Sequence, residues 1–293
     1  MLATIHQQMQ GEFRRAAPRW TIQPGISQSD MDFLHNECNA DSEFDTLQVR
    51  KKLYHGLHNG TAPFEVRTCE YGQVIAIYEA ASQKHAVPWD LWARILRLYH
   101  RDADKPFKVF FLASTHLRVF PKRPPIRTSN INAEPLVQPI HINGGYTYPC
   151  NHETIVLYRA EDATRVLLHE LMHSTCMDNQ ALGVDQVEAE TEAWAELYHA
   201  AFLSRGNKER FHQLVQQQSA WMQSQNARVQ QFMKKPKEFP WRYTVGKEEV
   251  WRRWGILQPP YAMPAAQESL RLTPPPSPMD QKAFGVPLHS TIL

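Results

Sequence analysis

The most informative part of this sequence is the stretch Val166-Leu167-Leu168-His169-Glu170-Leu171-Met172-His173, which predicts both a helix and a metal site. Its apolar residues indicate a largely buried helix over roughly residues 161–176. Residues i and i+4 share one face of a helix, so His169 and His173 point the same way. Glu170 lies about 100° around the helix from His169. Two histidines on a buried helix need partners, and this H-E-x-x-H spacing lets both bind one metal ion.

A second predicted helix, roughly residues 185–206, offers carboxylates for the same ion. Zinc accepts neutral imidazole nitrogens, and a catalytic zinc usually has three protein ligands. Glu188, Glu192 and Glu196 repeat every four residues and form an acidic stripe. Stacked carboxylates repel one another unless a cation or hydrogen-bond donors compensate. The loop that ends near Gly183 allows the stripe to face the histidines, so we expect a Zn²⁺ site with a glutamate as third ligand.

This pattern resembles the thermolysin-like gluzincins, a class of zinc metallopeptidases. In that family a glutamate on a downstream helix is the third ligand, and a carboxylate four residues later holds a ligand histidine. The resemblance implies that Glu192 joins His169 and His173 as a ligand and that Glu196 holds a histidine. Glu188 is the alternative third ligand, or a further supporting carboxylate.

Two shorter likenesses accompany it. The run Glu192-Ala193-Trp194-Ala195 looks like the ligand helix of small zincins that cleave repressors. The segments Ile155–Asp162 and Val166–Leu171 are similar, more weakly, to uncharacterised HELxH proteins of large DNA viruses.

The gluzincin resemblance implies an α+β fold with a zincin-like core: a small mixed sheet, an active-site helix and a ligand helix, with helical extensions at both ends. It also implies hydrolysis of a peptide or protein substrate, with Glu170 as the general base for a water activated by Zn²⁺. An edge strand over residues 153–158 would pair with an extended substrate by β-augmentation. The alternative is a structural or interaction protein, such as a virus-particle component, in which zinc holds two helices together.

Four regions are expected along the chain. Residues 1–105 are predicted to be mainly helical, and they include a helix at Trp89–Tyr99 and an apolar run, Val74–Tyr78, that fits a strand or a helix. Residues 106–206 would form the catalytic core. Residues 207–258 are predicted as a helical extension. The Pro-rich tail 259–293 is predicted to be extended or disordered, and the C-terminal region could dock onto a larger assembly.

Within the core, the sequence predicts strands at Val109–Leu112 and Thr154–Tyr158. It also predicts a hairpin that joins Ile140–Ile142 to Tyr146–Tyr148 through the turn Asn143-Gly144-Gly145. His141, Tyr146 and Tyr148 in this hairpin are candidate donors to an oxyanion. The cluster Trp251-Arg252-Arg253-Trp254 is a candidate cation–π group or docking patch.

Composition limits the other classes of function. The 32 basic and 30 acidic residues nearly balance, so we expect no nucleic-acid partner. No apolar run approaches the length of a membrane span, and the N-terminus does not read as a secretory signal. The four scattered cysteines predict free thiols, Cys150 and Cys176 included, in a reducing compartment. The expected location is therefore the cytoplasm, or a particle such as a virion assembled there.

Overall fold

The computed structural model describes residues 1–42, 45–85, 87–100, 105–122, 136–259 and 268–275. The chain divides into two compact units, each built from segments that are far apart in sequence. The sheet unit consists of Glu12–His116, Gly144–Cys176 and Pro275–Leu293. The helical unit consists of Met1–Gly11, Leu117–Asn143 and Met177–Pro274. These units do not follow the boundaries at residues 105, 206 and 258 that the sequence suggested.

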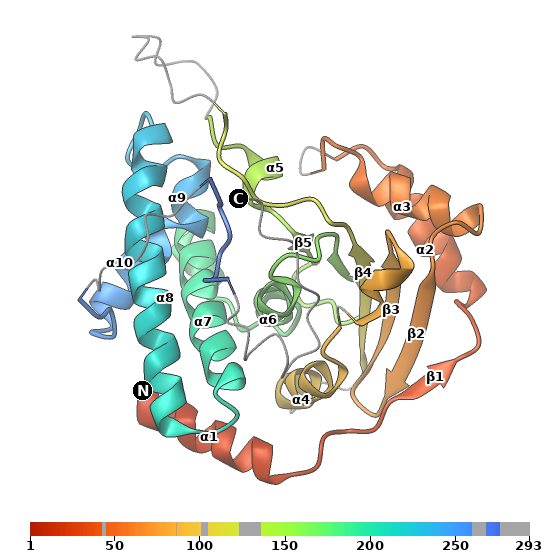
Figure 1. Cartoon of the computed structure of the whole chain (residues 1–293), viewed down its shortest axis with the longest axis horizontal. Coiled ribbons are helices and arrows are strands. Elements are labelled where there is room, and N and C mark those ends of the chain that lie inside the picture. The colour runs from red at the N-terminus through yellow and green to blue at the C-terminus, as the bar shows by residue number, and fades with distance from the viewer. Residues whose placement is uncertain (43–44, 86, 101–104, 123–135, 260–267, 276–293) are drawn as a thin grey trace. The chain divides into compact units, whose positions relative to one another are not determined.

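The sheet unit alternates helices and strands (Figure 1). α1 (Leu2–Arg14) continues into it from the helical unit. Its elements in chain order are β1 (Thr21–Gln23), α2 (Gln28–Asn39), α3 (Val49–His58), β2 (Phe64–Cys69), β3 (Gly72–Tyr78), η1 (Ala81–His85), α4 (Trp89–Tyr99), β4 (Phe107–Ala113), β5 (Gly145–Tyr146), β6 (Ile155–Leu157) and α6 (Ala163–Ser174). The described part of residues 1–105 thus contains four α-helices, and it also contributes β1, β2 and β3.

The six strands form one mixed sheet in the order β1-β2-β3-β4-β6-β5. β3, β4 and β6 run parallel, whereas β1, β2 and β5 are antiparallel to their neighbours. α4 connects the parallel pair β3 and β4, as a parallel crossover requires. The predicted α+β class with a mixed sheet is confirmed.

Alternating side chains of the strands fill two layers of core, one on each face of the sheet. Phe110 and Leu112 of β4 join a cluster that includes Leu34 of α2 and Leu53 of α3. The intervening Phe111 points to the opposite face and meets Trp92 of α4, with ring centroids 5.4 Å apart. α6 packs against α4, β5 and β6. Helices therefore cover both faces of the sheet, and α6 lies against its last two strands, β5 and β6.

Two predictions about this sheet are wrong. Ile140–Ile142 is not a strand of a hairpin, because it belongs to the short helix α5 (Pro139–Ile142), in which Pro139 occupies a first-turn position that suits proline. β5 pairs instead with β6, through the register Gly145 to Leu157 and Tyr146 to Val156. β6 consequently lies between β4 and β5, so it is not the edge strand expected at residues 153–158. The strand at this edge of the sheet is β5.

The helical unit is dominated by the two long helices α7 (Val184–Leu203) and α8 (Lys208–Val229). Its other elements are α5, η3 (Gln180–Leu182), η4 (Gln230–Phe232), α9 (Phe239–Tyr243) and α10 (Val245–Arg253). α10 approaches α7 closely, since a Cβ on Gly246 would lie 2.9 Å from that of Ala189. Trp251 of α10 is fully buried and donates its indole N–H to the carbonyl of Ala193.

The described part of the C-terminal tail is extended and packed. Ser269 pairs with Val119 in an isolated antiparallel bridge. Leu270 and Leu272 are buried. Residues 260–267 and 276–293 of the predicted tail lie outside the described residues.

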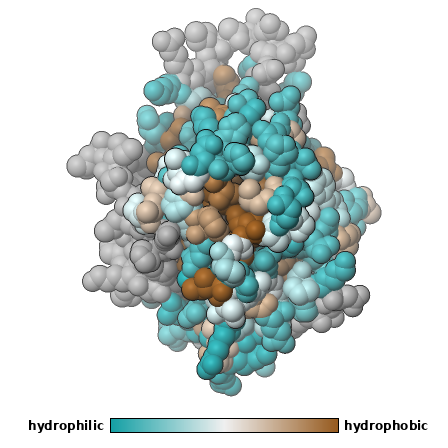
Figure 2. Space-filling view, turned by 90° about the vertical axis from the view of Figure 1, so that its right-hand side faces the viewer, coloured by the Kyte–Doolittle hydropathy of each residue, from teal (hydrophilic) through white to brown (hydrophobic). Residues whose placement is uncertain are grey.

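Figure 2 views the side of the sheet unit that carries α2, α3 and the first strands, where a small apolar area lies among polar residues. Large apolar side chains exposed in these strands include Ile22 of β1 and Phe64 of β2.

Among the described residues, no helix is long and apolar enough to cross a membrane.

Candidate metal centre

α6 carries the H-E-x-x-H motif and forms as the sequence predicts. Leu167, Leu168 and Leu171 are fully buried, which anchors the helix against the sheet. The burial extends to the polar residues of the motif, because His169 is 6% exposed and Glu170 is 4% exposed. A buried carboxylate and a buried imidazole are expensive to desolvate without bound partners. The motif is therefore part of the interior and not a solvated helix face.

The two histidine rings converge at one point. The Nε2 atoms of His169 and His173 lie 2.9 Å apart, so one nitrogen can donate a hydrogen bond to the other. Zinc bound tetrahedrally to two imidazoles, at about 2.0–2.1 Å each, holds the two nitrogens about 3.3 Å apart. A small opening of the pair would thus fit the ion. The i, i+4 convergence that the sequence predicted is present.

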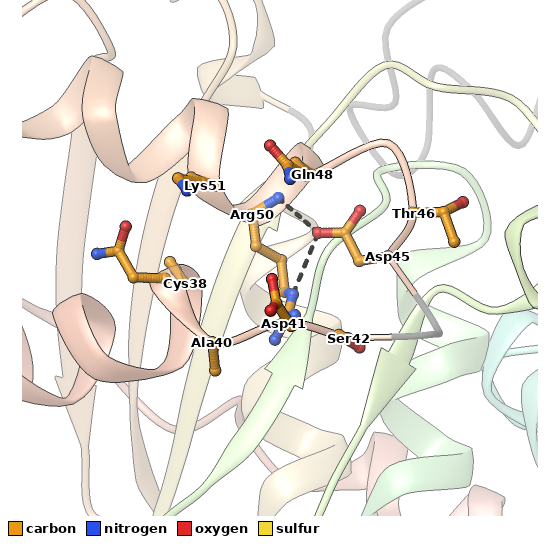
Figure 3. Close-up of a pocket in the computed structure, with 10 residues that line it drawn as sticks. Cys38, Ala40, Asp41, Ser42, Asp45, Thr46, Gln48, Arg50 and Lys51 are labelled. Carbon is orange, nitrogen blue, oxygen red and sulfur yellow. Dashed lines mark hydrogen bonds and ion pairs between the residues drawn. The ribbon is translucent and has the colours of Figure 1, made fainter.

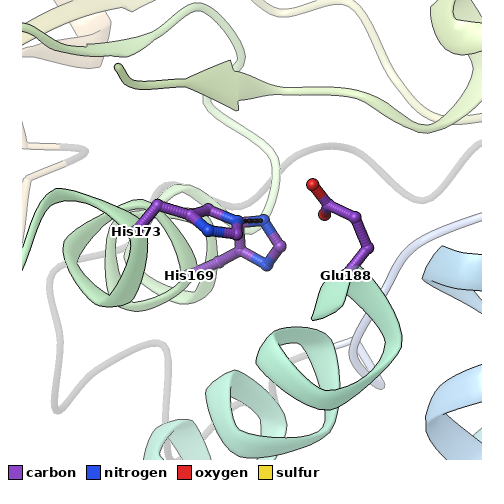
Figure 4. Close-up of side chains that lie close together, drawn as sticks. All are labelled: His169, His173 and Glu188. Carbon is purple, nitrogen blue, oxygen red and sulfur yellow. Dashed lines mark hydrogen bonds between the residues drawn. The ribbon is translucent and has the colours of Figure 1, made fainter. Parts of the chain in front are cut away.

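Glu188 is a candidate third ligand for such an ion. His169, His173 and Glu188 are residues of the types that could together hold a metal ion (Figure 4). The histidines belong to the sheet unit and Glu188, at the start of α7, belongs to the helical unit, so we treat a shared site as a proposal. The assignment of Glu192 as third ligand stays a prediction.

The rest of the acidic stripe has a cation of its own, Lys247 of α10. Its ammonium group is fully buried and donates to Glu196 Oε1 at 2.6 Å. The same Nζ atom is 3.8 Å from Glu192 Oε2. Carboxylates stacked along one helix face need such a compensating charge. The sequence indicated that the acidic stripe needs a compensating cation. The structure identifies Lys247 as that cation.

The sequence did hold a signal for this lysine. Lys247 shares a helical face with Val250, Trp251 and Trp254 at spacings of three, four and seven residues. A charged residue on an otherwise apolar face is expected to be buried with a partner. The predicted cluster at residues 251–254 divides: Trp254 packs on Trp194 with centroids 4.6 Å apart, whereas Arg252 pairs with Glu248 and Arg253 with Glu190.

Tyr243 is a second residue that sequence reasoning missed. It ends α9, beside the acidic stripe. Burial and the negative charges of Glu188 and Glu192 raise the pKa of the Tyr243 phenol well above its usual value, although Arg242 opposes the shift. The hydroxyl therefore stays protonated at neutral pH and can donate a hydrogen bond.

The prediction of four free thiols is wrong. Cys150 and Cys176 form a disulfide, with Cα atoms 4.9 Å apart, and only Cys38 and Cys69 are free. The sequence separation of 26 residues gave no indication of this pairing. The fold creates it, because the loop after β5 returns to the C-terminal end of α6. Cys176 immediately follows that helix and its capping residue Thr175.

The candidate oxyanion donors from the predicted hairpin have other partners. Tyr146 donates its hydroxyl to Glu37 at 2.6 Å and accepts from Arg50, also at 2.6 Å. The ring of His141 accepts a hydrogen bond from the backbone N–H of Gln138. Tyr148 is half exposed. These hydrogen bonds account for the hydroxyl of Tyr146 and for one ring nitrogen of His141.

A polar pocket of about 260 Å³ lies elsewhere in the sheet unit, around the loop between α2 and α3 (Figure 3). Asp45 accepts hydrogen bonds there from the backbone N–H and the side chain of Arg50. The same carboxylate accepts the N–H of Val49 and so satisfies the start of α3. None of the candidate metal ligands lines this pocket, and Asp45 and Arg50 form an ion pair within it.

Comparisons with protein-family models, with curated proteins and with solved structures found no match to this chain.

Proposed function

We propose that this chain is a zinc-dependent hydrolase that cleaves peptide bonds. One observation carries the proposal: the Nε2 atoms of His169 and His173 meet at 2.9 Å on a buried helix that also buries Glu170. A purely structural zinc site needs the two histidines but has no use for the glutamate between them. The combination favours hydrolytic chemistry.

For the third ligand we propose Glu188. Lys247 holds Glu196 and lies near Glu192, so these two carboxylates already share a cation. Glu188 is the member of the stripe that the group of possible ligands includes with the two histidines. Glu192 is the alternative that the gluzincin resemblance implies. Glutamine substitutions separate the two, because the amide keeps the shape of the side chain but is a poorer zinc ligand.

In the proposed reaction each residue has one role. Zinc, when bound, lowers the pKa of a water molecule into the neutral range. Glu170 would act as the general base, taking a proton from the attacking water and passing it to the leaving amine. β5, which ends the sheet, replaces residues 153–158 as the strand beside which an extended peptide could bind.

The test compares two variants of the motif with the wild type. Glu170→Gln should keep zinc and thermal stability but lose peptide hydrolysis by about two or more orders of magnitude, the usual scale for a general base. His169→Ala should lose zinc and activity together. The measurements are elemental analysis and digestion of a broad peptide library. A wild type that holds zinc but cleaves nothing, with Glu170→Gln indistinguishable from it, would instead support the structural, interaction-protein alternative.

A further inference from the structure

The disulfide between Cys150 and Cys176 lies at the end of the helix that carries the proposed ligands. Cys176 follows His173 by three residues. The backbone N–H groups of both half-cystines donate to a single acceptor, the carbonyl of His173, at 3.0 Å from Cys150 and 3.2 Å from Cys176. The cross-link and these two hydrogen bonds therefore close a small ring around the backbone of His173.

Both half-cystines have the left-handed backbone conformation, with φ of 61° at Cys150 and 56° at Cys176. Residues other than Gly, Asn and Asp rarely adopt this conformation, because the Cβ crowds the carbonyl oxygen. The covalent bond between the two residues links their turns and restrains both of them. Without this bond, each residue is free to return to an ordinary conformation, and the turn that holds the His173 carbonyl can change shape.

The disulfide is accessible to reductants, since both Cys150 and Cys176 are exposed. Exposed disulfides belong to the labile and regulatory class more often than buried ones do. The two free cysteines differ from this pair: Cys38 is buried and Cys69 is partly buried. Among the described cysteines, the pair at the end of α6 is thus the one that a reductant in solution can reach directly.

We propose that the Cys150–Cys176 disulfide is a redox-controlled clamp that positions His173 for metal binding. The inference rests on the proposed zinc site. A dithiol reductant opens the clamp: one of its thiolates attacks a cystine sulfur, and its second thiol then resolves the mixed disulfide. Two electrons and two protons pass to the chain, which gains two thiols, while the reductant becomes a disulfide. The oxidised chain binds zinc tightly and the reduced chain binds it weakly, because metal ligands must be held within fractions of an ångström.

The experiment measures zinc affinity of the full chain by competition with a chromogenic chelator. The samples are the oxidised chain, the chain reduced with a dithiol that is then removed without air, and the variant C150S/C176S. The variant C38S/C69S is the matched control, because it removes two cysteines and leaves the clamp intact. We expect the reduced chain and C150S/C176S to bind zinc about 10-fold or more weakly than the oxidised chain, on the scale of losing a residue that supports a ligand. C38S/C69S should keep the full difference between its oxidised and reduced forms.

Other results would contradict either the clamp or the proposed zinc site. Equal affinity in all samples, within about twofold, overturns the clamp. Tighter binding by the reduced chain, but not by C150S/C176S, also overturns it, and would make the released thiolates zinc ligands. Absence of zinc from the oxidised chain overturns the proposed function instead. In that case, hydrogen exchange at the last turn of α6 decides about the clamp: protection that is the same in the oxidised and reduced chains shows that the disulfide does not hold the turn.

Discussion

Lys247→Met removes the cation from the acidic stripe while nearly preserving the volume of the side chain. Both sides of the pair with Glu196 are fully buried, and Nζ is 2.6 Å from Oε1. Removing one partner of a buried ion pair costs about 3–5 kcal/mol, because the remaining charge stays buried without compensation. Here Glu192 lies only 3.8 Å from the same ammonium group, so a second carboxylate loses its nearest cation. We expect a loss near the upper end of that range.

Urea unfolding followed by tryptophan fluorescence, in the presence of a chelator, measures this loss without a contribution from zinc. With a slope of about 2 kcal/mol per molar urea, the midpoint of Lys247→Met should fall by about 2.5 M. Lys105→Met is the matched control, because Lys105 and Glu153 form an exposed pair, 68% and 57% accessible, at 3.6 Å. Such surface pairs contribute about 0–1 kcal/mol. Adding Glu196→Gln to Lys247→Met should recover much of the stability. A midpoint shift no larger than that of Lys105→Met would refute the assignment of Lys247 as the compensating cation.

Three further outcomes are expected. Glu188→Gln should lose most zinc affinity and Glu192→Gln less, as measured by competition with a chelator; the reverse order would restore the family-like assignment of Glu192. Burial raises the pKa of the Cys38 thiol to about 12, so this thiol should stay protonated and resist alkylation at pH 8 until the chain is unfolded, which mass spectrometry can follow. Gly145→Ala should destabilise the chain by about 1–3 kcal/mol, because its Cβ would lie 2.7 Å from Cγ1 of Val166 on α6; an unchanged melting temperature would argue against this close packing.

Local features of this protein could be derived from its sequence alone. The helix at Trp89–Tyr99 and the strand within Phe107–Ala113 follow from apolar spacing over neighbouring residues. The convergence of His169 and His173 is likewise local, because the geometry of a single helix brings residues four apart onto one face. A regular helix needs no information from elsewhere in the chain to bring these two rings together.

Tertiary structure decided the features that depend on residues distant in sequence. β6 is interior because β4 and β5 pair with its two edges, which no pattern within residues 153–158 reveals. Cys150 meets Cys176 only because the chain between them folds back on itself, and Lys247 reaches Glu196 across 51 residues. Hydrophobic periodicity reports which side of an element is buried, but many pairings of elements satisfy the same pattern. The choice among them is made by packing of the whole chain, and so is the distribution of charge around the proposed ligands.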